Sequence, residues 1–276
     1  MKHKDCAGKT SKPYNDMLTH LYRMVEGSYA CGNSQIPLLG ITIGEMLNRI
    51  AAAHPDNEAL VSVHQNIRWT YAEFLERVDT LARALMALDV ERGDRVGIWA
   101  LNYAEWVLVQ FATAKIGAIM VNINPSYRTY EFEYAMKQAE IQTLIIQGRF
   151  KTSDYVGMFY EACPEAFEAK PGRIHSDKFP FLKNVIFLGD IPYNGMYTWD
   201  ELMEKAALIS PDELREREEA LDFDDPVNIQ YTSGTTGFPK GVILTHHNIL
   251  NNGFIIGEGM KFTHKDRLCI PVPFFH

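Results

Sequence analysis

The feature that most constrains the fold is a regular alternation of strand-like and helix-like segments along the chain. Short apolar runs alternate with stretches in which apolar residues recur every three or four positions, a pattern typical of β-α-β units. The strand-like runs are 95–100, 118–123, 143–147 and 185–188, and the helix-like stretches between them are 104–116, 131–139 and 153–162. This alternation predicts an α/β fold with layered helices and a mostly parallel sheet, whose ligands bind at loops beyond the strand ends.

Local signals extend this interpretation toward both ends. Residues 42–45 and 70–73 each have Thr followed three positions later by Glu, which predicts a capping box that opens a helix. Residues 59–63 and 67–70 are expected to pair as a hairpin, and the charged stretch 212–219 is expected to form a solvated helix.

The strongest chemical signal is the stretch 231–241, which is Tyr-Thr-Ser-Gly-Thr-Thr-Gly-Phe-Pro-Lys-Gly. Its hydroxyls can donate to phosphate oxygens, and its glycines let successive backbone N–H groups converge on one anion. A lysine adds a mobile positive charge, and the preceding proline stiffens its approach. Strand patterns at 226–230 and 241–244 flank the loop. The candidate phosphate-binding residues are Thr232, Ser233, Gly234, Thr235, Thr236, Gly237, Phe238, Pro239 and Lys240.

The spacing excludes the two commonest phosphate loops. A Walker loop needs Gly, four residues and then Gly-Lys-Ser/Thr, but counting from Gly234 places Pro239 at the second glycine and Gly241 after Lys240. The dinucleotide fingerprint Gly-x-Gly-x-x-Gly fails as well, and no Gly-x-Ser-x-Gly elbow is present to make Ser233 a nucleophile.

Two neighbouring histidines, His246 and His247, follow the loop. No His-Glu-x-x-His or Cys-x-x-Cys spacing accompanies them, so a structural role at the start of a helix capped by Thr245 or Asn248 is the preferred interpretation. The sequence predicts no metal ligand.

Residues 232–241 resemble the hallmark Thr-Ser-Gly-Thr-Thr-Gly-x-Pro-Lys-Gly of the adenylate-forming superfamily without a mismatch. That superfamily includes acyl-CoA synthetases, firefly luciferase and the adenylation domains of peptide synthetases. Residues 122–138 are similar to an Asn-Pro-x-Tyr-x-x-x-Glu-x-x-Tyr segment of the fatty acyl-CoA synthetases, and 93–106 resemble their early strand and helix. The resemblance implies the N-terminal portion of the large domain of such an enzyme.

The resemblance also implies a reaction. A fatty acid, ATP and CoA would be the substrates, with Mg²⁺ as cofactor, and the products would be acyl-CoA, AMP and pyrophosphate. Residues 232–237 and Lys240 would hold the β- and γ-phosphates. The segment Phe274, Phe275 and His276 looks like the family's next motif, which borders the acyl group, and His276 joins Lys240 as a candidate catalytic residue.

The same resemblance divides the chain into an N-terminal extension, 1–35, and an incomplete AMP-binding domain, 36–276. The family's later motifs and its small C-terminal domain have no counterpart in the sequence, so we expect a fragment that is inactive alone. Residues 269–276 have the apolar character of a core strand.

Composition narrows the partners. A net charge of −8 argues against nucleic acid, for which a basic face is expected. No run approaches the length of a membrane span, and peripheral membrane contact stays open.

Four cysteines without metal or redox spacing suggest a reducing compartment. The first thirty residues contain one arginine and three acids, which favours the cytoplasm over the mitochondrial matrix. The sequence does not indicate an oligomeric state.

Two alternatives remain open at this point. The chain belongs to an enzyme that adenylates another acid, such as an aryl, luciferin-like or amino acid, or it is a non-catalytic remnant that binds nucleotide weakly. Only the segment 122–138 speaks for a fatty acid over other acids.

Overall fold

The structure is a computed structural model that describes residues 36–232 and 239–276. The chain divides into two units, Met1–Leu38 and Leu39–His276, and every helix and strand given below lies in the second. The expected domain boundary at residue 35/36 stays a prediction. Among the described residues, no helix combines the length and apolar character needed to cross a bilayer.

The second unit alternates helices and strands. The α-helices of the described residues are α2 (Ile43–Ala53), α3 (Tyr71–Met86), α4 (Ala104–Ile116), α5 (Thr129–Gln138), α6 (Tyr155–Ala162), α7 (Trp199–Glu204), α8 (Pro211–Glu219) and α9 (His246–Met260). The strands are β1 (Glu58–Ser62), β2 (Ile67–Thr70), β3 (Arg95–Trp99), β4 (Ile119–Asn122), β5 (Thr143–Ile146), β6 (Arg149–Phe150), β7 (Ser153–Asp154), β8 (Asn184–Phe187), β9 (Tyr197–Thr198), β10 (Pro226–Thr232) and β11 (Lys240–Thr245).

The main sheet has seven strands in the order β11-β10-β4-β3-β5-β8-β9. All neighbouring pairs are parallel except β10 and β11, which form an antiparallel hairpin at one edge. The mostly parallel sheet predicted from the alternation is therefore confirmed. Because the carboxyl ends of parallel strands meet at one edge of a sheet, the loop after β10 emerges beside the ends of β4 and β3.

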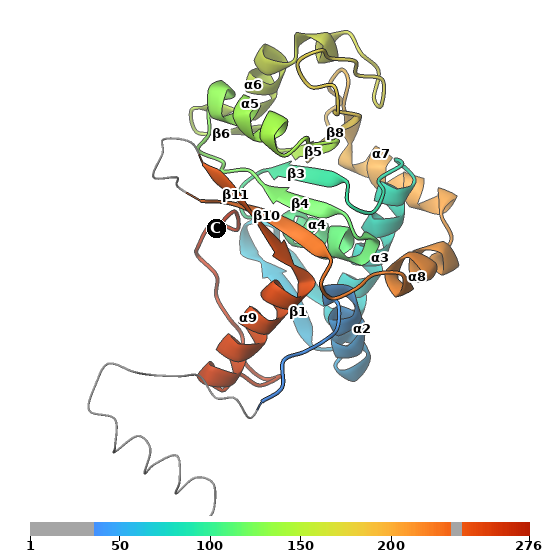
Figure 1. Cartoon of the computed structure of the whole chain (residues 1–276), viewed down its shortest axis with the longest axis vertical. Helices are drawn as coiled ribbons and strands as arrows, with labels where there is room; N and C mark the ends of the chain where they lie inside the picture. The colour runs from blue at the N-terminus through green and yellow to red at the C-terminus, as the bar shows by residue number, and fades with distance from the viewer. Residues whose placement is uncertain (1–35, 233–238) are drawn as a thin grey trace, which may run out of the picture. The chain divides into compact units, whose positions relative to one another are not determined.

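The sheet separates two hydrophobic cores, since successive strand residues point to opposite faces. Val96 and Ile98 contribute to a core with α3 and α4, whereas Trp99 lies in a core with α5 and α6. Figure 1 shows α5 and α6 on one side of the sheet and α3 and α4 on the other. Any residue larger than glycine at position 97 in β3 would displace the packed Ile141 side chain, because a Cβ there would lie 2.8 Å from Ile141 Cδ1.

The predicted hairpin and the helix start at Thr70 are confirmed, with Thr70 and Glu73 bonded reciprocally as a capping box. Two local expectations differ from the structure. Thr42 caps α2 by accepting from the Glu45 N–H at 3.1 Å, but the Glu45 carboxylate pairs with Arg49 instead of closing the box. The helix expected at 153–162 begins at Tyr155, because Ser153–Asp154 pairs with β6 first.

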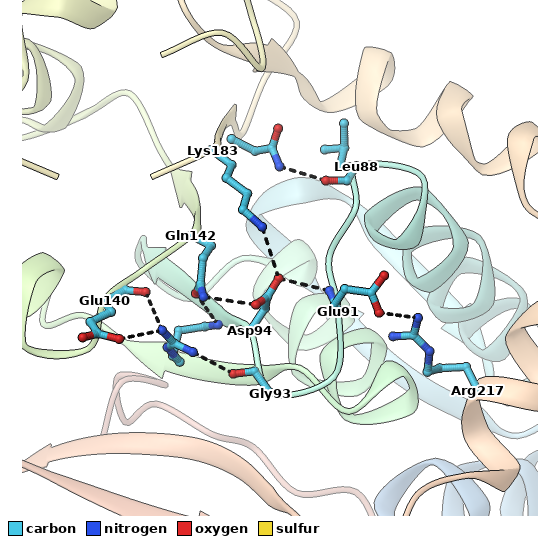
Figure 2. Close-up of polar contacts among 10 residues, drawn as sticks. Leu88, Glu91, Gly93, Asp94, Glu140, Gln142, Lys183 and Arg217 are labelled. Carbon is cyan, nitrogen blue, oxygen red and sulfur yellow. Dashed lines mark hydrogen bonds and ion pairs between the residues drawn. The ribbon is translucent and has the colours of Figure 1, made fainter. Parts of the chain in front are cut away.

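The amino edge of the sheet, where β3, β5 and β8 begin, is closed by side-chain hydrogen bonds (Figure 2). Asp94 accepts from the Glu91 N–H and from the Gln142 side-chain amide, both at 3.1 Å. Gln142 in turn accepts from the Arg95 N–H at 2.7 Å. The Arg95 guanidinium donates to the carbonyl oxygens of Gly93, Ala139 and Glu140 and to the Glu140 carboxylate. This edge therefore uses its polar groups to hold the strand starts together.

Candidate functional site

The two flanks of the predicted phosphate loop lie opposite each other at the carboxyl edge. Thr232 ends β10, Lys240 begins β11, and the two residues pair across the hairpin. The Thr232 hydroxyl donates to the Lys240 carbonyl oxygen at 3.4 Å, and both residues are exposed. Among the described residues, the Lys240 ammonium has no hydrogen-bond or ion-pair partner. None of the described groups therefore competes with an anion for this ammonium.

The six residues between these flanks lie outside the described residues, so their predicted role rests on the sequence. They are Ser233, Gly234, Thr235, Thr236, Gly237 and Phe238. The structure describes the next residue, Pro239, as half-buried.

The Gly241 position shows why the motif ends in glycine. A Cβ at this position would lie 3.1 Å from Ile229 Cγ2 and 3.6 Å from the Tyr231 ring, so any larger residue would press on the side chains of β10. Glycine lets β11 pair closely with β10 and brings Lys240 opposite Thr232.

Helix α5 contacts both flanks through two tyrosines. The Tyr231 hydroxyl donates to the Ala135 carbonyl oxygen at 3.3 Å, and the Tyr134 hydroxyl donates to the Pro239 carbonyl oxygen at 3.2 Å. Burial raises the pKa of Tyr231, so its hydroxyl stays neutral and acts as a donor.

The segment predicted to border the acyl group forms a turn at the same edge. The His276 N–H donates to the Pro273 carbonyl oxygen at 3.2 Å, and the rings of Phe275 and His276 have centroids 4.1 Å apart. Phe274 packs against Trp106 of α4 with 5.3 Å between ring centroids. His276 itself is exposed.

Two side-chain amides hold this turn against the sheet. Asn102, just after β3, donates to the Val272 carbonyl oxygen at 2.9 Å and accepts from the Phe274 N–H at 2.8 Å. Gln230 in β10 donates to the Phe275 carbonyl oxygen. Because Gln230 lies two residues before Thr232, one strand carries both a flank of the predicted phosphate loop and a support of the predicted acyl segment.

Gln230 is itself fixed by a row of buried amides. Asn228 donates to the Asn122 side-chain oxygen at 3.2 Å, and Asn122 donates to the Gln230 side-chain oxygen at 2.9 Å. These amides were not singled out from the sequence as site residues. Their signal is the occurrence of Asn and Gln at 122, 228 and 230 inside otherwise apolar strands, because a buried amide needs partners on a neighbouring strand.

The core-strand character expected for 269–276 is wrong. The segment forms no strand, and its Ile270 and Val272 are each more than half exposed. The physical reason is that no strand among residues 36–232 and 239–276 pairs with it, so the Asn102 side chain supplies the hydrogen bonds that a neighbouring strand would give.

The two histidines after the loop have structural surroundings. His246 is fully buried at the start of α9, where its Nδ1 accepts from the Ile43 N–H at 3.2 Å. Burial lowers its pKa to about 4, and Asp225 and Asp222 oppose this shift.

Within the described part of the chain, no group of three His, Cys, Asp or Glu residues is placed to hold a metal ion.

A hollow of about 670 Å³ lies away from this edge, between α2, α3, α4 and α8. Its floor is Lys115, which is 1% exposed. The Lys115 ammonium contacts Asn48 at 2.9 Å, Glu218 at 3.3 Å, and Asp79. Since these three acceptors can satisfy all three ammonium protons, the Lys115 ammonium has no free donor for a ligand, and the cluster ties α8 to α2, α3 and α4.

Comparison with known proteins gives matches over most of the chain. The family model described as "AMP-binding enzyme" matches residues 47–276. A putative acyl-CoA synthetase, YngI of Bacillus subtilis, is 47% identical over 239 residues, which cover 87% of this chain and 44% of the relative. The mitochondrial medium-chain acyl-CoA ligase ACSF2 of Danio rerio is 41% identical over 251 residues, which cover 90% of this chain and 41% of the relative. The chain therefore spans less than half the length of these curated relatives.

Solved structures agree on the fold. The N-terminal domain of FACL13 from Mycobacterium tuberculosis, in an inhibitor-bound crystal structure, has a TM-score of 0.67 at 26% identity, over 86% of this chain and 52% of that one. The long-chain-fatty-acid-CoA ligase FadD1 from Archaeoglobus fulgidus has a TM-score of 0.68 at 24% identity, over 90% and 46% of the two chains.

Proposed function

The chain belongs to the family of AMP-binding enzymes, and from this premise we propose that the complete protein activates a medium- or long-chain fatty acid with ATP and transfers it to CoA. In the first step the fatty-acid carboxylate attacks the α-phosphorus of ATP, which forms an acyl-adenylate and releases pyrophosphate. In the second step the CoA thiolate attacks the acyl carbon, a thioester forms, and AMP leaves with the bonding electrons.

The first step has an electrostatic difficulty, because a carboxylate must approach a polyanion and pyrophosphate must depart with added charge. Preorganised donors aimed at the departing phosphates lower that barrier. Lys240 and Thr232 are candidates for this role, since both are exposed at the carboxyl edge and the Lys240 ammonium has no polar partner among the described residues. The loop residues 233–238 would add hydroxyl and backbone donors. Mg²⁺ would supply further charge neutralisation on the phosphates.

The observation that carries the proposal is that β10 contains a residue beside each of the two candidate subsites, the phosphate subsite and the acyl subsite. Thr232 flanks the phosphate loop, while Gln230 holds the backbone of the Phe274–His276 segment. Adenylation needs an acyl carboxylate and a triphosphate side by side. The position of Thr232 and Gln230 near the end of one strand supports this proposal. Phe274, Phe275 and His276 would border the acyl group.

The class of acid rests on the relatives, whose names specify a medium-chain acyl-CoA ligase and a long-chain-fatty-acid-CoA ligase. A cytoplasmic location remains our expectation from the N-terminal composition, although several relatives are named as mitochondrial.

Acid-dependent exchange of pyrophosphate into ATP by the complete protein tests this function. We expect exchange with octanoate or palmitate, followed by thioester formation when CoA is added. Exchange with benzoate or an amino acid alone would move the protein to a different substrate class. Absence of exchange with every acid, together with retained MgATP binding, would make it a nucleotide-binding remnant.

A further inference from the structure

The two ends of the phosphate loop are tied to one helix by a reciprocal pair of hydrogen bonds. Tyr231 of β10 donates to a carbonyl oxygen of α5, and Tyr134 of α5 donates to the carbonyl oxygen that immediately precedes β11. We call this pair, Tyr134 and Tyr231, the tyrosine clasp. It joins segments about 100 residues apart in sequence, and it contacts the chain on both sides of residues 233–238.

Helix α5 is a firm support for such a clasp. Phe132 and Met136 are buried in the core beneath it, and the Phe132 ring stacks on Trp99 of β3 with 4.3 Å between centroids. The first turn is fixed by the Glu131 carboxylate, which accepts from the Arg128 N–H at 3.1 Å. A group hydrogen-bonded to α5 is therefore held relative to the centre of the sheet.

The bond from Tyr134 acts on Lys240 through covalent geometry. The Pro239 carbonyl oxygen and the Lys240 nitrogen and Cα share one planar peptide unit. Holding that oxygen sets the orientation of the plane from which the Lys240 side chain departs. Because the pyrrolidine ring fixes φ of Pro239, the chain has one backbone rotation fewer with which to undo this constraint.

We propose that Tyr134 is a positioning residue for the nucleotide, which with Tyr231 sets the placement of Lys240 and Thr232 against the phosphates of ATP. This inference rests on the proposed function only in taking the phosphate as the group that Lys240 and Thr232 contact. The contact that carries this role is the hydrogen bond from Tyr134 to the Pro239 carbonyl oxygen.

The test is the substitution Tyr134→Phe in the complete protein, which removes one oxygen and keeps the ring. We expect the dissociation constant for MgATP, measured by calorimetry, to rise about fivefold, the scale of one net hydrogen bond. In the exchange assay the KM for MgATP should rise while the KM for the acid stays unchanged. A purely structural role would lower the melting temperature and leave this split absent.

Tyr160→Phe is the matched control. The Tyr160 hydroxyl of α6 also donates to a backbone carbonyl oxygen, that of Asn194, at 2.8 Å, and it contacts neither flank of the loop. We expect this variant to bind MgATP as the wild type does. Equal MgATP affinity in Tyr134→Phe and the wild type, or equal weakening in Tyr160→Phe, would overturn the proposal.

A second variant, and a binding measurement that needs no acid, distinguish failure of the tyrosine clasp from failure of the proposed fatty-acid activity. If Tyr134→Phe does not fold, Tyr231→Phe removes the other half of the clasp and is judged by the same affinity criterion. Calorimetry with MgATP needs no acid, so a wild type that binds MgATP but shows no exchange would refute the fatty-acid activity and still report on the clasp. A wild type that binds no MgATP would refute both.

Discussion

The two edges of the seven-stranded sheet use similar residues in opposite ways. At the amino edge, the Arg95 guanidinium donates to four acceptors within the protein. The Gln142 side chain accepts from the Arg95 N–H and donates to Asp94 (Figure 2). At the carboxyl edge, the Lys240 ammonium has no polar partner among the described residues and faces solvent. A basic group whose donors are all satisfied within the protein stabilises the fold, whereas a basic group with no polar partner in the described part of the chain can bind an anion.

The contrast also separates stability from activity. The amino edge is where each parallel strand starts, and its bonds fix the register of β3, β5 and β8. At the carboxyl edge, hydrogen bonds of Asn122, Gln230 and the tyrosine clasp hold the backbone near the candidate site. The side chains of Lys240 and His276 themselves are exposed. We therefore expect substitutions at the first edge to change unfolding and substitutions at the second to change kinetics.

The largest expected effect is that of Lys240→Ala. Removing one donor that acts in the transition state slows reactions by roughly 10²–10³-fold. We expect this loss in acid-dependent pyrophosphate exchange, with little change in the melting temperature. Lys183→Ala, at the amino edge, is the control, because Lys183 is exposed and 4.0 Å from Asp94. Unchanged exchange in Lys240→Ala would break the comparison at its centre.

A second prediction concerns pH and the buried His246 beside the start of β10. Its pKa is lowered to about 4 in the folded chain against an ordinary 6.5, so the unfolded chain binds a proton first as pH falls. The contribution of neutral His246 to the free energy of unfolding is fully present above about pH 6.5. It is lost as the pH falls toward 4, by up to about 3 kcal/mol. Urea unfolding at several pH values measures this loss.

The variant His246→Asn should show a smaller loss of stability between pH 6.5 and pH 4, since Asn cannot titrate and its side-chain oxygen can accept from the Ile43 N–H. The neighbouring His247→Asn serves as the comparison, because His247 is only half-buried. If both variants keep the full pH dependence, other groups are responsible for it.

The smallest expected effect compares the two edges of the sheet directly, because a glutamine flanks β5 on each side, Gln142 at the amino edge and Gln147 at the carboxyl edge. Gln142 accepts from the Arg95 N–H and Gln147 from the Leu101 N–H, both at 2.7 Å, and both side chains are buried. Leucine at either position leaves a backbone N–H unpaired and should lower the free energy of unfolding by about 2 kcal/mol.

Only Gln147→Leu should also change the kinetics with fatty acid, since Leu101 precedes Asn102, which holds the Phe274 segment. Denaturant titration and the KM for the acid distinguish the two variants. An equal change of KM in Gln142→Leu would show that the edges are not functionally distinct.

The sequence anticipated much of this fold because its signals are local. The boundaries of α4 (Ala104–Ile116), the capping box at Thr70 and the hairpin of β1 and β2 follow from periodicity and capping over a few residues. It failed at 269–276, where an apolar run was interpreted as a strand, because a strand needs a partner and periodicity does not report one. It also missed Asn122, Gln230 and Asn102, whose partners lie on other elements.

By itself the sequence determined the order of helices and strands, hence a parallel sheet with its loops at one edge, and it identified the one loop whose residues suit a polyphosphate. The tertiary structure alone decided that Gln230 and Asn102 bring the segment 272–275 to that edge, and that Tyr134 reaches the carbonyl oxygen of Pro239. The physical reason is range. Periodicity and capping act over a few residues, whereas these hydrogen bonds join residues 45 to 170 positions apart and exist only once the strands are in register.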